Sequence, residues 1–212
     1  MKSLIWVVVV FIVIVGALVI FNGSSSSSSQ FSLTEVSPSD HVKGRTVDTG
    51  ASSTVVLIEY ADFQCPACRS YYPILLELSQ TYSDKVTFVY RHFPLKQIHF
   101  NAEPAAWASE AASKQGKFWE MHNLLFEKQN EWSSASDLKK VFGDYAVLIG
   151  IDKEQFLADL DSGEVKDIVK SQRESAVKNG FNATPTFVLN GEKLDSPQSI
   201  QAFKLLIDKA LK

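Results

Sequence analysis

The feature that most constrains the fold is a pair of cysteines placed where a predicted strand gives way to a predicted helix. Residues 54–60 form a continuous apolar run rich in β-branched side chains, which is typical of a buried strand. A C-x-x-C motif, Cys65 to Cys68, follows this run, and apolar side chains then recur at helical spacing as far as Tyr82. Pro66 suits the first turn of that helix, where the missing N–H has no intrahelical partner. The sequence therefore predicts a strand–turn–helix unit with both sulfurs at the helix N-terminus.

This position gives the two thiols different chemistry. Peptide dipoles and unpaired N–H groups at a helix N-terminus stabilise an anion. We therefore expect the pKa of Cys65 to lie well below the value of about 8.5 that a free thiol has. Cys68 lies one turn further along the same side of the helix and can reach the sulfur of Cys65. An exposed attacking thiolate beside a shielded resolving thiol is the arrangement that thiol–disulfide exchange requires.

Composition disfavours several other classes of protein. The chain has 212 residues, and its two cysteines are too few for a structural disulfide framework. Its net charge of -3 disfavours nucleic acid as a partner, since proteins that bind nucleic acid usually carry a basic face. A structural zinc site generally needs four ligands, and we expect neither a metal nor another cofactor, because the two sulfurs hold the electrons themselves. The histidines are scattered singly along the chain: His41, His92, His99 and His122.

The N-terminal segment, residues 1–22, predicts a transmembrane anchor. The 18 residues from Leu4 to Phe21 contain no charged side chain, and roughly 20 apolar residues cross a bilayer as a helix. Lys2 precedes this segment and the next basic residue is Lys43, so the positive-inside rule places the N-terminus in the cytoplasm and the rest of the chain outside. We therefore expect a single-pass protein of the cell membrane. A cleaved signal peptide is the alternative, but its apolar run is normally shorter and ends in small residues.

The remaining sequence divides into a linker and one folded domain. Residues 23–40 predict a flexible linker, because an unbroken run of serines, Ser24 to Ser29, cannot bury apolar area. Residues 41–212 predict the folded domain, and their alternation of strands and helices indicates an α/β fold. Further elements are expected as follows: strands at 86–92 and 186–189, a helical block at 101–178, a hairpin turn at Asn190-Gly191, and a last helix at 197–211 with Ser196 as its N-cap.

Four segments of the chain carry a resemblance to a known family: EYADFQCPAC at 59–68, RHFPL at 91–95, GKFWEMH at 116–122 and TPTF at 184–187. They resemble the DsbA-type branch of the thioredoxin superfamily, and the sequence is most similar to its membrane-anchored bacterial thiol oxidases. The resemblance runs from about His41 to the C-terminus, with the segments in the same order as in the family. It implies a thioredoxin fold with a helical insertion at about residues 99–180, preceded by one transmembrane helix.

The resemblance implies a role for each residue of the site. Cys65 corresponds to the nucleophile and Cys68 to the resolving thiol. Pro185 resembles the family's cis-proline, and the backbone edge at Thr184 is expected to pair with an extended substrate, beside Pro66 and Ala67. Glu59 matches a buried acid that relays protons to the inner cysteine; the alternative is a satisfied charge at a strand end. Ala67 departs from the strongest oxidants of the family, which carry a histidine there, so we expect a less oxidising disulfide.

The sequence thus predicts an extracytoplasmic thiol–disulfide oxidoreductase that introduces disulfides into secreted or surface proteins. Its expected partners are unfolded or folding proteins that contain cysteine and, from the resemblance, a quinone-linked redox protein of the membrane. Three alternatives stay open at this point. They are a disulfide reductase or isomerase, a non-catalytic peptide-binding chaperone that uses the groove near Pro185, and a thiol-to-metal shuttle.

Overall fold

A computed structural model describes residues 36–37, 39–44 and 55–212. The strands are β1 (His41–Gly44), β2 (Val55–Ala61), β3 (Val86–His92), β4 (Thr186–Leu189) and β5 (Glu192–Lys193). The helices are α2 (Pro66–Thr81), α3 (Ala102–Ser113), α4 (Phe118–Glu127), α5 (Gln129–Trp132), α6 (Leu138–Leu148), α7 (Lys153–Leu160), α8 (Gly163–Lys178) and α9 (Ile200–Ala210).

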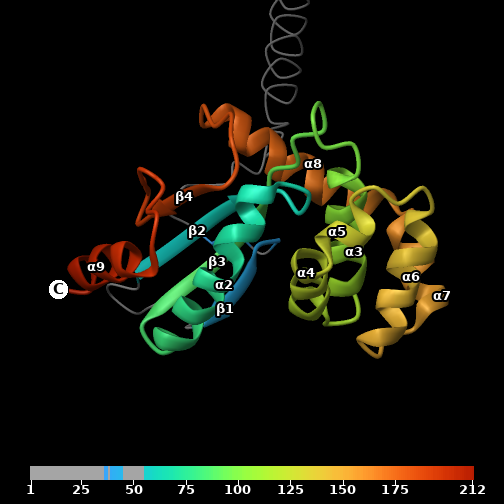
Figure 1. The fold of residues 1–212 in the computed structure, drawn as a ribbon, viewed down its shortest axis with the longest axis horizontal. Coiled ribbons are helices and arrows are strands. Elements are labelled where there is room, and N and C mark those ends of the chain that lie inside the picture. The colour runs from blue at the N-terminus through green and yellow to red at the C-terminus, as the bar shows by residue number, and fades with distance from the viewer. Residues whose placement is uncertain (1–35, 38, 45–54) are drawn as a thin grey trace, which may run out of the picture. The chain divides into compact units, whose positions relative to one another are not determined.

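The strands form one sheet in the order β1-β3-β2-β4-β5 (Figure 1). Strand β2 lies at the centre, parallel to β3 and antiparallel to β4. All seven residues of β2 are buried, which explains why its sequence is a continuous apolar run rather than an alternating one. Because β2 and β3 are parallel and β4 is antiparallel to them, the end of β2, the end of β3 and the start of β4 meet at one edge of the sheet.

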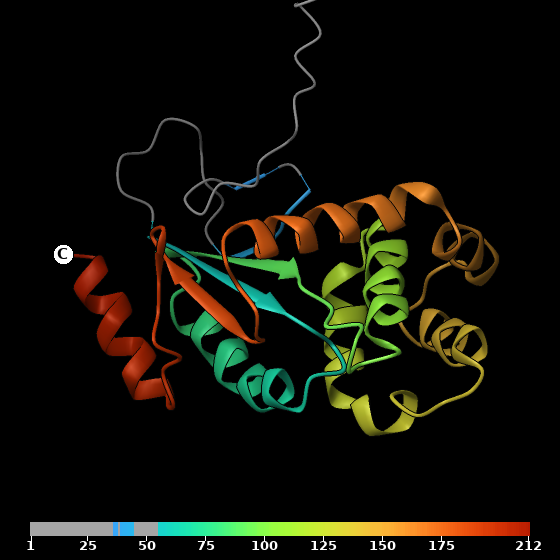
Figure 2. The same cartoon turned by 90° about the horizontal axis from the view of Figure 1, so that it is seen from above.

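Helices cover both faces of the sheet, and Figure 2 shows α2 and α8 on opposite sides of it. Alternate residues of β2 point to opposite faces, so one strand contributes to two separate apolar clusters. The cluster under α2 and α9 contains Val55, Leu57, Leu78, Tyr82, Phe187, Leu189, Phe203 and Ile207. The cluster on the α8 side contains Val56, Ile58, Tyr60, Val89, Ala176, Phe181 and Val188.

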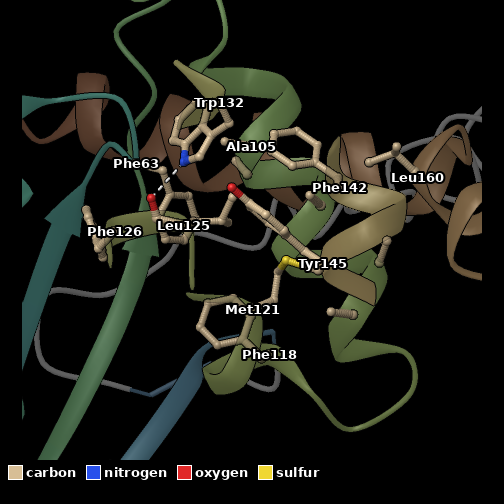
Figure 3. Packing of buried hydrophobic residues seen from close by; sticks show 14 of the residues in the cluster. Phe63, Ala105, Phe118, Met121, Leu125, Phe126, Trp132, Phe142, Tyr145 and Leu160 are labelled. Carbon is tan, nitrogen blue, oxygen red and sulfur yellow. Dashed lines mark hydrogen bonds between the residues drawn. The ribbon is translucent and has the colours of Figure 1, made fainter. Parts of the chain in front are cut away.

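The helices from α3 to α8 form the insertion between β3 and β4, and they enclose an apolar core of their own (Figure 3). Trp132 lies fully buried within it and donates a hydrogen bond from its indole Nε1 to the carbonyl oxygen of Leu125 at 2.7 Å. The same core includes Phe63, Cys65 and Cys68. The insertion therefore packs directly against the cysteine motif.

Most of the predicted elements are confirmed, and one helix start is wrong. Residues Asn190 and Gly191 have φ of 49° and 87°, as a two-residue hairpin turn requires, and they join β4 to β5. Helix α9 begins at Ile200 rather than at residue 197, and Ser199, not Ser196, accepts from the N–H of Ala202 at 3.2 Å. The amphipathic repeat of the helix starts only at Ile200, so the serine directly before it makes the cap. Strand β1 is an addition to the predicted elements.

The predicted anchor at residues 1–22 and most of the predicted linker lie outside the described residues. Within the part of the chain that the structure describes, no helix has both the length and the apolar character needed to cross a bilayer. The described N-terminal residues pack on the domain: the carboxylate of Asp40 is buried against Arg91, with atoms as close as 2.7 Å.

Candidate active site

The turn between β2 and α2 brings the C-x-x-C motif to the edge of the sheet. The side chain of Asp62 accepts a hydrogen bond from the N–H of Gln64 at 2.7 Å, and the N–H of Cys65 donates to the carbonyl oxygen of Asp62 at 3.1 Å. Cys65 is the N-cap residue of α2, and Pro66 is its first helical residue. The N–H groups of the first turn therefore point toward the sulfur of Cys65.

The two cysteines are free thiols in very different surroundings. Cys68 is fully buried, and Cys65 is only 6% exposed, so the expectation of an exposed attacking thiolate is wrong. Pro66 and Ala67 between the cysteines are the exposed part of the motif. The sulfur of Cys65 lies 3.4 Å from the carbonyl oxygen of Thr184 and donates to it when protonated. The two residues between the cysteines thus face solvent, while the inner sulfur is withdrawn into the core.

These surroundings separate the pKa values of the thiols. Hydrogen bonds to the thiolate, first from the Cys68 thiol and then from the N–H groups of Cys68 and Ala67, outweigh burial and lower the pKa of Cys65 to about 5. Burial, the hydrogen bond to Cys65 and the nearby charges of Cys65 and Glu59 raise the pKa of Cys68 well above its usual value. At neutral pH Cys65 is therefore a thiolate and Cys68 a thiol, which are the protonation states that an attacking and a resolving sulfur require.

The peptide bond between Thr184 and Pro185 is cis, as the resemblance predicted. The next residue, Thr186, opens β4 and pairs with Tyr60 of β2, so the start of β4 lies beside the end of the central strand. This register and the contact between Cys65 and the Thr184 carbonyl bring together residues that are 119 positions apart in the sequence.

Glu59 lies inside β2, between Phe187 and Tyr90 of the neighbouring strands. It is 7% exposed, and its Oε1 has no hydrogen-bond partner among the described residues. Burial, and then the charge of Cys65, raise the pKa of Glu59 to about 8. Glu59 thus lies within β2 rather than at its end, and its raised pKa keeps the carboxyl largely protonated at neutral pH. A cavity of about 50 Å³ adjoins it and has room for water.

Gln129 of α5 is a supporting residue that the sequence analysis missed. Its Nε2 donates to the carbonyl oxygens of Phe63 at 2.7 Å and of Cys65 at 3.0 Å. The glutamine thus ties the helical insertion to the backbone around the nucleophile. A side chain that binds backbone carbonyls 66 and 64 residues away forms no recognisable sequence motif.

Two of the histidines that appear scattered in the sequence meet in the structure. The Nε2 atoms of His41 and His92 each lie 2.8 Å from Oε1 of Glu110. Burial alone raises the pKa of Glu110, but the two histidine contacts outweigh it and lower that pKa to about 2. These three side chains are the group among the described residues that offers three ligand atoms within 4.8 Å of one another. They join β1, β3 and α3.

The fold and the cysteine site together define the class of protein, a DsbA-type thiol–disulfide oxidoreductase. The chain belongs to the thioredoxin family, whose sequence profile matches residues 43–209.

Several solved structures share the fold. A thioredoxin-like oxidoreductase from Silicibacter pomeroyi has 26% identity and a TM-score of 0.66, over 82% of this chain and 93% of its own. A variant of α-DsbA1 from Wolbachia pipientis has 25% identity and a TM-score of 0.71, over 87% of this chain and 95% of its own. BdbD from Bacillus subtilis in its oxidised form has 24% identity and a TM-score of 0.70, over 82% of this chain and 93% of its own.

The curated relatives are named as Na(+)/H(+) antiporters rather than as oxidoreductases. Na(+)/H(+) antiporter NhaA 1 of Mycolicibacterium vanbaalenii is 41% identical over 162 residues, which are 74% of this chain and 24% of that protein. NhaA of Herminiimonas arsenicoxydans is 36% identical over 155 residues, which are 73% of this chain and 23% of that protein. The chain spans about a quarter of the length of these relatives. The antiport activity in their names is that of the whole proteins and is not transferred to this chain.

Proposed function

We propose that this protein is an extracytoplasmic thiol oxidase that introduces disulfides into secreted or surface proteins. The observation that carries the proposal is the stabilised thiolate of Cys65, whose pKa falls to about 5. Stabilising the thiolate stabilises the reduced enzyme, and a couple with a stable reduced form is oxidising. The low pKa also makes Cys65 a good leaving group, which speeds release of the oxidised client.

The chemistry begins from the disulfide between Cys65 and Cys68. A client thiolate attacks the sulfur of Cys65, so that a mixed disulfide forms and the sulfur of Cys68 leaves with the electron pair. A second client thiolate then attacks the client sulfur of the mixed disulfide and expels Cys65 as a thiolate. The client loses two electrons and gains a disulfide, and the enzyme is left as the dithiol.

Glu59 suits the first of these steps as a proton donor. The departing sulfur of Cys68 is buried and has a raised pKa, so it needs a proton as the disulfide opens. Burial, the larger cause of its raised pKa, acts on Glu59 whether the cysteines are free or joined, and it favours the protonated carboxyl. When the enzyme is reoxidised, the same carboxylate takes the proton back and frees Cys68 to attack the mixed disulfide.

The reduction potential tests the direction of the reaction. Ala67 gives the Cys65 thiolate no side-chain hydrogen bond, so we expect a potential between about -270 mV, the thioredoxin value, and about -120 mV, the DsbA value. Equilibration of the purified domain with glutathione redox buffers measures it. A potential near or below the thioredoxin value contradicts the oxidase and favours the reductase or isomerase.

Continued turnover needs an electron acceptor outside the cytoplasm. We propose a quinone-linked membrane protein for that role and residues 1–22 as the anchor that holds the domain near it, since residues 4–21 carry no charge. In fractionated cells the protein should stay with the membranes at high salt and alkaline pH. Release of a soluble form that begins near Gly23 would instead indicate a cleaved signal peptide.

A further inference from the structure

The cavity beside Glu59 extends from the buried sheet toward solvent. Its volume of about 50 Å³ is enough for several waters, since one water needs roughly 10–15 Å³. Buried residues of β2 and β3, among them Glu59 and Tyr90, form its inner wall. Half-buried residues of β1 and α4 also line it: Lys43, Trp119 and Asn123. The cavity therefore joins a buried carboxyl to the surface of the domain.

Glu59 and Tyr90 reach this cavity from neighbouring strands. They are directly paired across β2 and β3, and directly paired residues of adjacent strands point to the same face of a sheet. Leu57 and Phe88, two residues before them, belong to the apolar cluster under α2, and residues two apart share a face. The carboxyl and the phenol hydroxyl therefore lie on the side of the sheet where α2 holds Cys68.

Aromatic neighbours hold the ring of Tyr90 in place. It stacks on Phe63 at 5.1 Å between ring centroids, and the ring of His122 meets it edge-on at 4.9 Å. Tyr90 is 1% exposed, and its hydroxyl has no hydrogen-bond partner among the described residues. A buried hydroxyl without a partner is unfavourable, and a water in the cavity supplies the missing bond. The ring packing thus fixes the position of a hydroxyl that requires such a water.

The Oε1 atom of Glu59 is a second buried polar atom without a partner in the described part of the chain. Two such atoms on paired residues that line one cavity define a place for water that bridges them. When Cys65 is part of a mixed disulfide it carries no charge, so burial is then the main cause that keeps the pKa of Glu59 raised. Hydrogen bonds from water to the Glu59 carboxylate oppose that effect, because they favour the charged form.

Few other charges face the Glu59 carboxyl. Burial lowers the pKa of His122 to about 3, so this ring is neutral at physiological pH. Phe187, the partner of Glu59 in β4, carries no charge. The titratable side chains near Glu59 or on the wall of its cavity are these: Cys65, Cys68 and Tyr72 from α2, Tyr90 from β3, His122 from α4 and Lys43 from β1.

We propose that Tyr90 is a positioning residue for the exchange reaction: its hydroxyl holds water against the Glu59 carboxyl, and this water carries the proton of Cys68 between Glu59 and solvent. The inference rests on the proposed function of Glu59 as the proton donor, and it names the path by which that donor exchanges its proton. The residues expected to bind a client do not line the cavity: Pro66, Ala67 and Thr184. A bound client therefore leaves the path to solvent free.

Resolution of a mixed disulfide on Cys65 releases one proton along this path. Cys68 gives its proton to the Glu59 carboxylate, and the sulfur of Cys68 attacks the sulfur of Cys65. The electron pair of the broken bond leaves on the departing sulfur, which becomes a thiolate. Glu59 then passes the proton to the water, and from there it reaches solvent. Opening of the disulfide between Cys65 and Cys68 takes up one proton by the reverse path.

The resolution step can be followed with oxidised glutathione as the probe. An excess of it converts the reduced full-length protein to the mixed disulfide at Cys65. Acid quenching and mass spectrometry then give the first-order loss of that species from pH 5 to pH 9. In wild type the rate should rise with the fraction of Glu59 carboxylate. In Tyr90→Phe the rate at pH 6 should fall roughly tenfold, the weight of one hydrogen bond to a charged group, and the pH profile should move up by about one unit.

Tyr72→Phe is the matched control, because Tyr72 lines the same cavity but its hydroxyl donates to Glu127 at 2.8 Å. It should leave the pH profile unchanged. Neither tyrosine variant should change the rate at which Cys65 reacts with iodoacetamide. Glu59→Gln should be slower than Tyr90→Phe and should lose the pH dependence that Glu59 causes.

Two outcomes for Tyr90→Phe overturn the proposed path while the role of Glu59 stands. One is a pH profile equal to that of wild type when Glu59→Gln is slow. The other is an equal slowing of resolution and of the iodoacetamide reaction, since the hydroxyl then only supports the fold. If Glu59→Gln resolves the mixed disulfide as fast as wild type, the proton-donor role of Glu59 itself fails and the path fails with it.

Discussion

At the scale of single residues, the structure explains how two identical side chains take opposite roles. Cys65 is held at the first N–H groups of α2, whereas Cys68, one turn on, is fully buried against the helical insertion. The sequence predicts the first environment, because the motif opens a helix. It predicts the second only in outline, since Cys68 belongs to an apolar core that is completed by residues of the helical insertion, which are distant in sequence.

The difference in pKa between the two thiols can be observed by alkylation. In the reduced protein, Cys65 should react with iodoacetamide at pH 6 while Cys68 stays unlabelled, and the rate should titrate with a midpoint near pH 5. Mass spectrometry of the digested protein locates the label. Cys65→Ser serves as the control and should show almost no reaction at pH 6. Preferential labelling of Cys68 would reverse the assigned roles.

The raised pKa of Glu59 makes the stability of the folded protein depend on pH. Its pKa is raised from 4.5 to about 8 in the folded protein, so between these values the unfolded chain binds fewer protons than the folded one. The free energy of unfolding therefore falls as the pH rises through this window. At 1.36 kcal/mol per pH unit, Glu59 destabilises the fold by about 3 kcal/mol at pH 7. Glu59→Gln should remove this loss.

Urea unfolding of wild type and Glu59→Gln at pH 4 and pH 8 measures the effect. The variant should be more stable at pH 8, and the difference should disappear at pH 4, where the glutamate is neutral in both states. The charge of Cys65 is the second cause of the raised pKa, so the difference should be smaller in the disulfide form. A variant less stable than wild type at both pH values would mean that Glu59 is satisfied by a partner.

At the scale of secondary structure, the elements with strong local signals are the ones that the sequence predicts. The buried run of β2, the helix opened by Pro66 and the Asn190-Gly191 hairpin each have a local chemical cause. The predicted start of α9 is wrong because two serines precede the helix, and only Ser199 lies directly before its apolar repeat. The four-residue β1 has too few residues to show a period, and its pairing with β3 is what defines it.

Gly44, at the end of β1, provides a test of how this strand is held. Its φ is 85°, and a Cβ built there lies 2.6 Å from the carbonyl oxygen of Val86. In Gly44→Ala, the left-handed conformation should therefore destabilise the domain by about 1–2 kcal/mol. The clash with the carbonyl oxygen of Val86 should add to that loss. The matched control is Gly116→Ala, which has a φ of 74° but no atom within 4 Å of its Cβ, and which should show the conformational part alone. Equal losses of stability for the two variants would contradict the tight packing of β1.

At the scale of the whole molecule, the site is assembled from three distant parts of the chain. Cys65 ends the turn after β2, Thr184 precedes β4, and Gln129 belongs to the insertion. The C-x-x-C motif can be found from spacing and chemistry alone. The cis isomer of the bond before Pro185 was predicted only from the resemblance, because a proline at the start of a strand can follow either a cis or a trans bond. Gln129 could be found only from the fold, because its hydrogen bonds run from the helical insertion to the backbone of the cysteine turn.

The oxidase proposal makes a prediction about the stability of the whole domain in its two redox states. The folded protein lowers the pKa of Cys65 from 9.0 to about 5. A depressed pKa contributes stability that is fully present above the unfolded value and is lost as the pH falls through the folded value. This contribution exists only in the reduced form, since the disulfide form has no thiol to ionise. The reduced form should therefore gain stability relative to the disulfide form as the pH rises from 5 to 9.

Parallel urea unfolding of the reduced and disulfide forms at pH 5, 7 and 9 measures this gain. The burial of Glu59 acts in both forms and largely cancels from the comparison, although the charge of Cys65 opposes part of the gain in the reduced form by raising the pKa of Glu59 further. Cys65→Ser under reducing conditions should lose the extra stability at high pH. Cys68→Ser should retain most of it, because the serine hydroxyl can donate to the Cys65 thiolate in place of the Cys68 thiol and the N–H groups of the helix N-terminus remain. The difference in unfolding free energy between the two redox states is also the free energy that makes the disulfide oxidising toward an unfolded client. A difference that stays flat from pH 5 to pH 9 would therefore remove the physical basis for oxidation as the direction of the reaction, while leaving the exchange chemistry of the two cysteines in place.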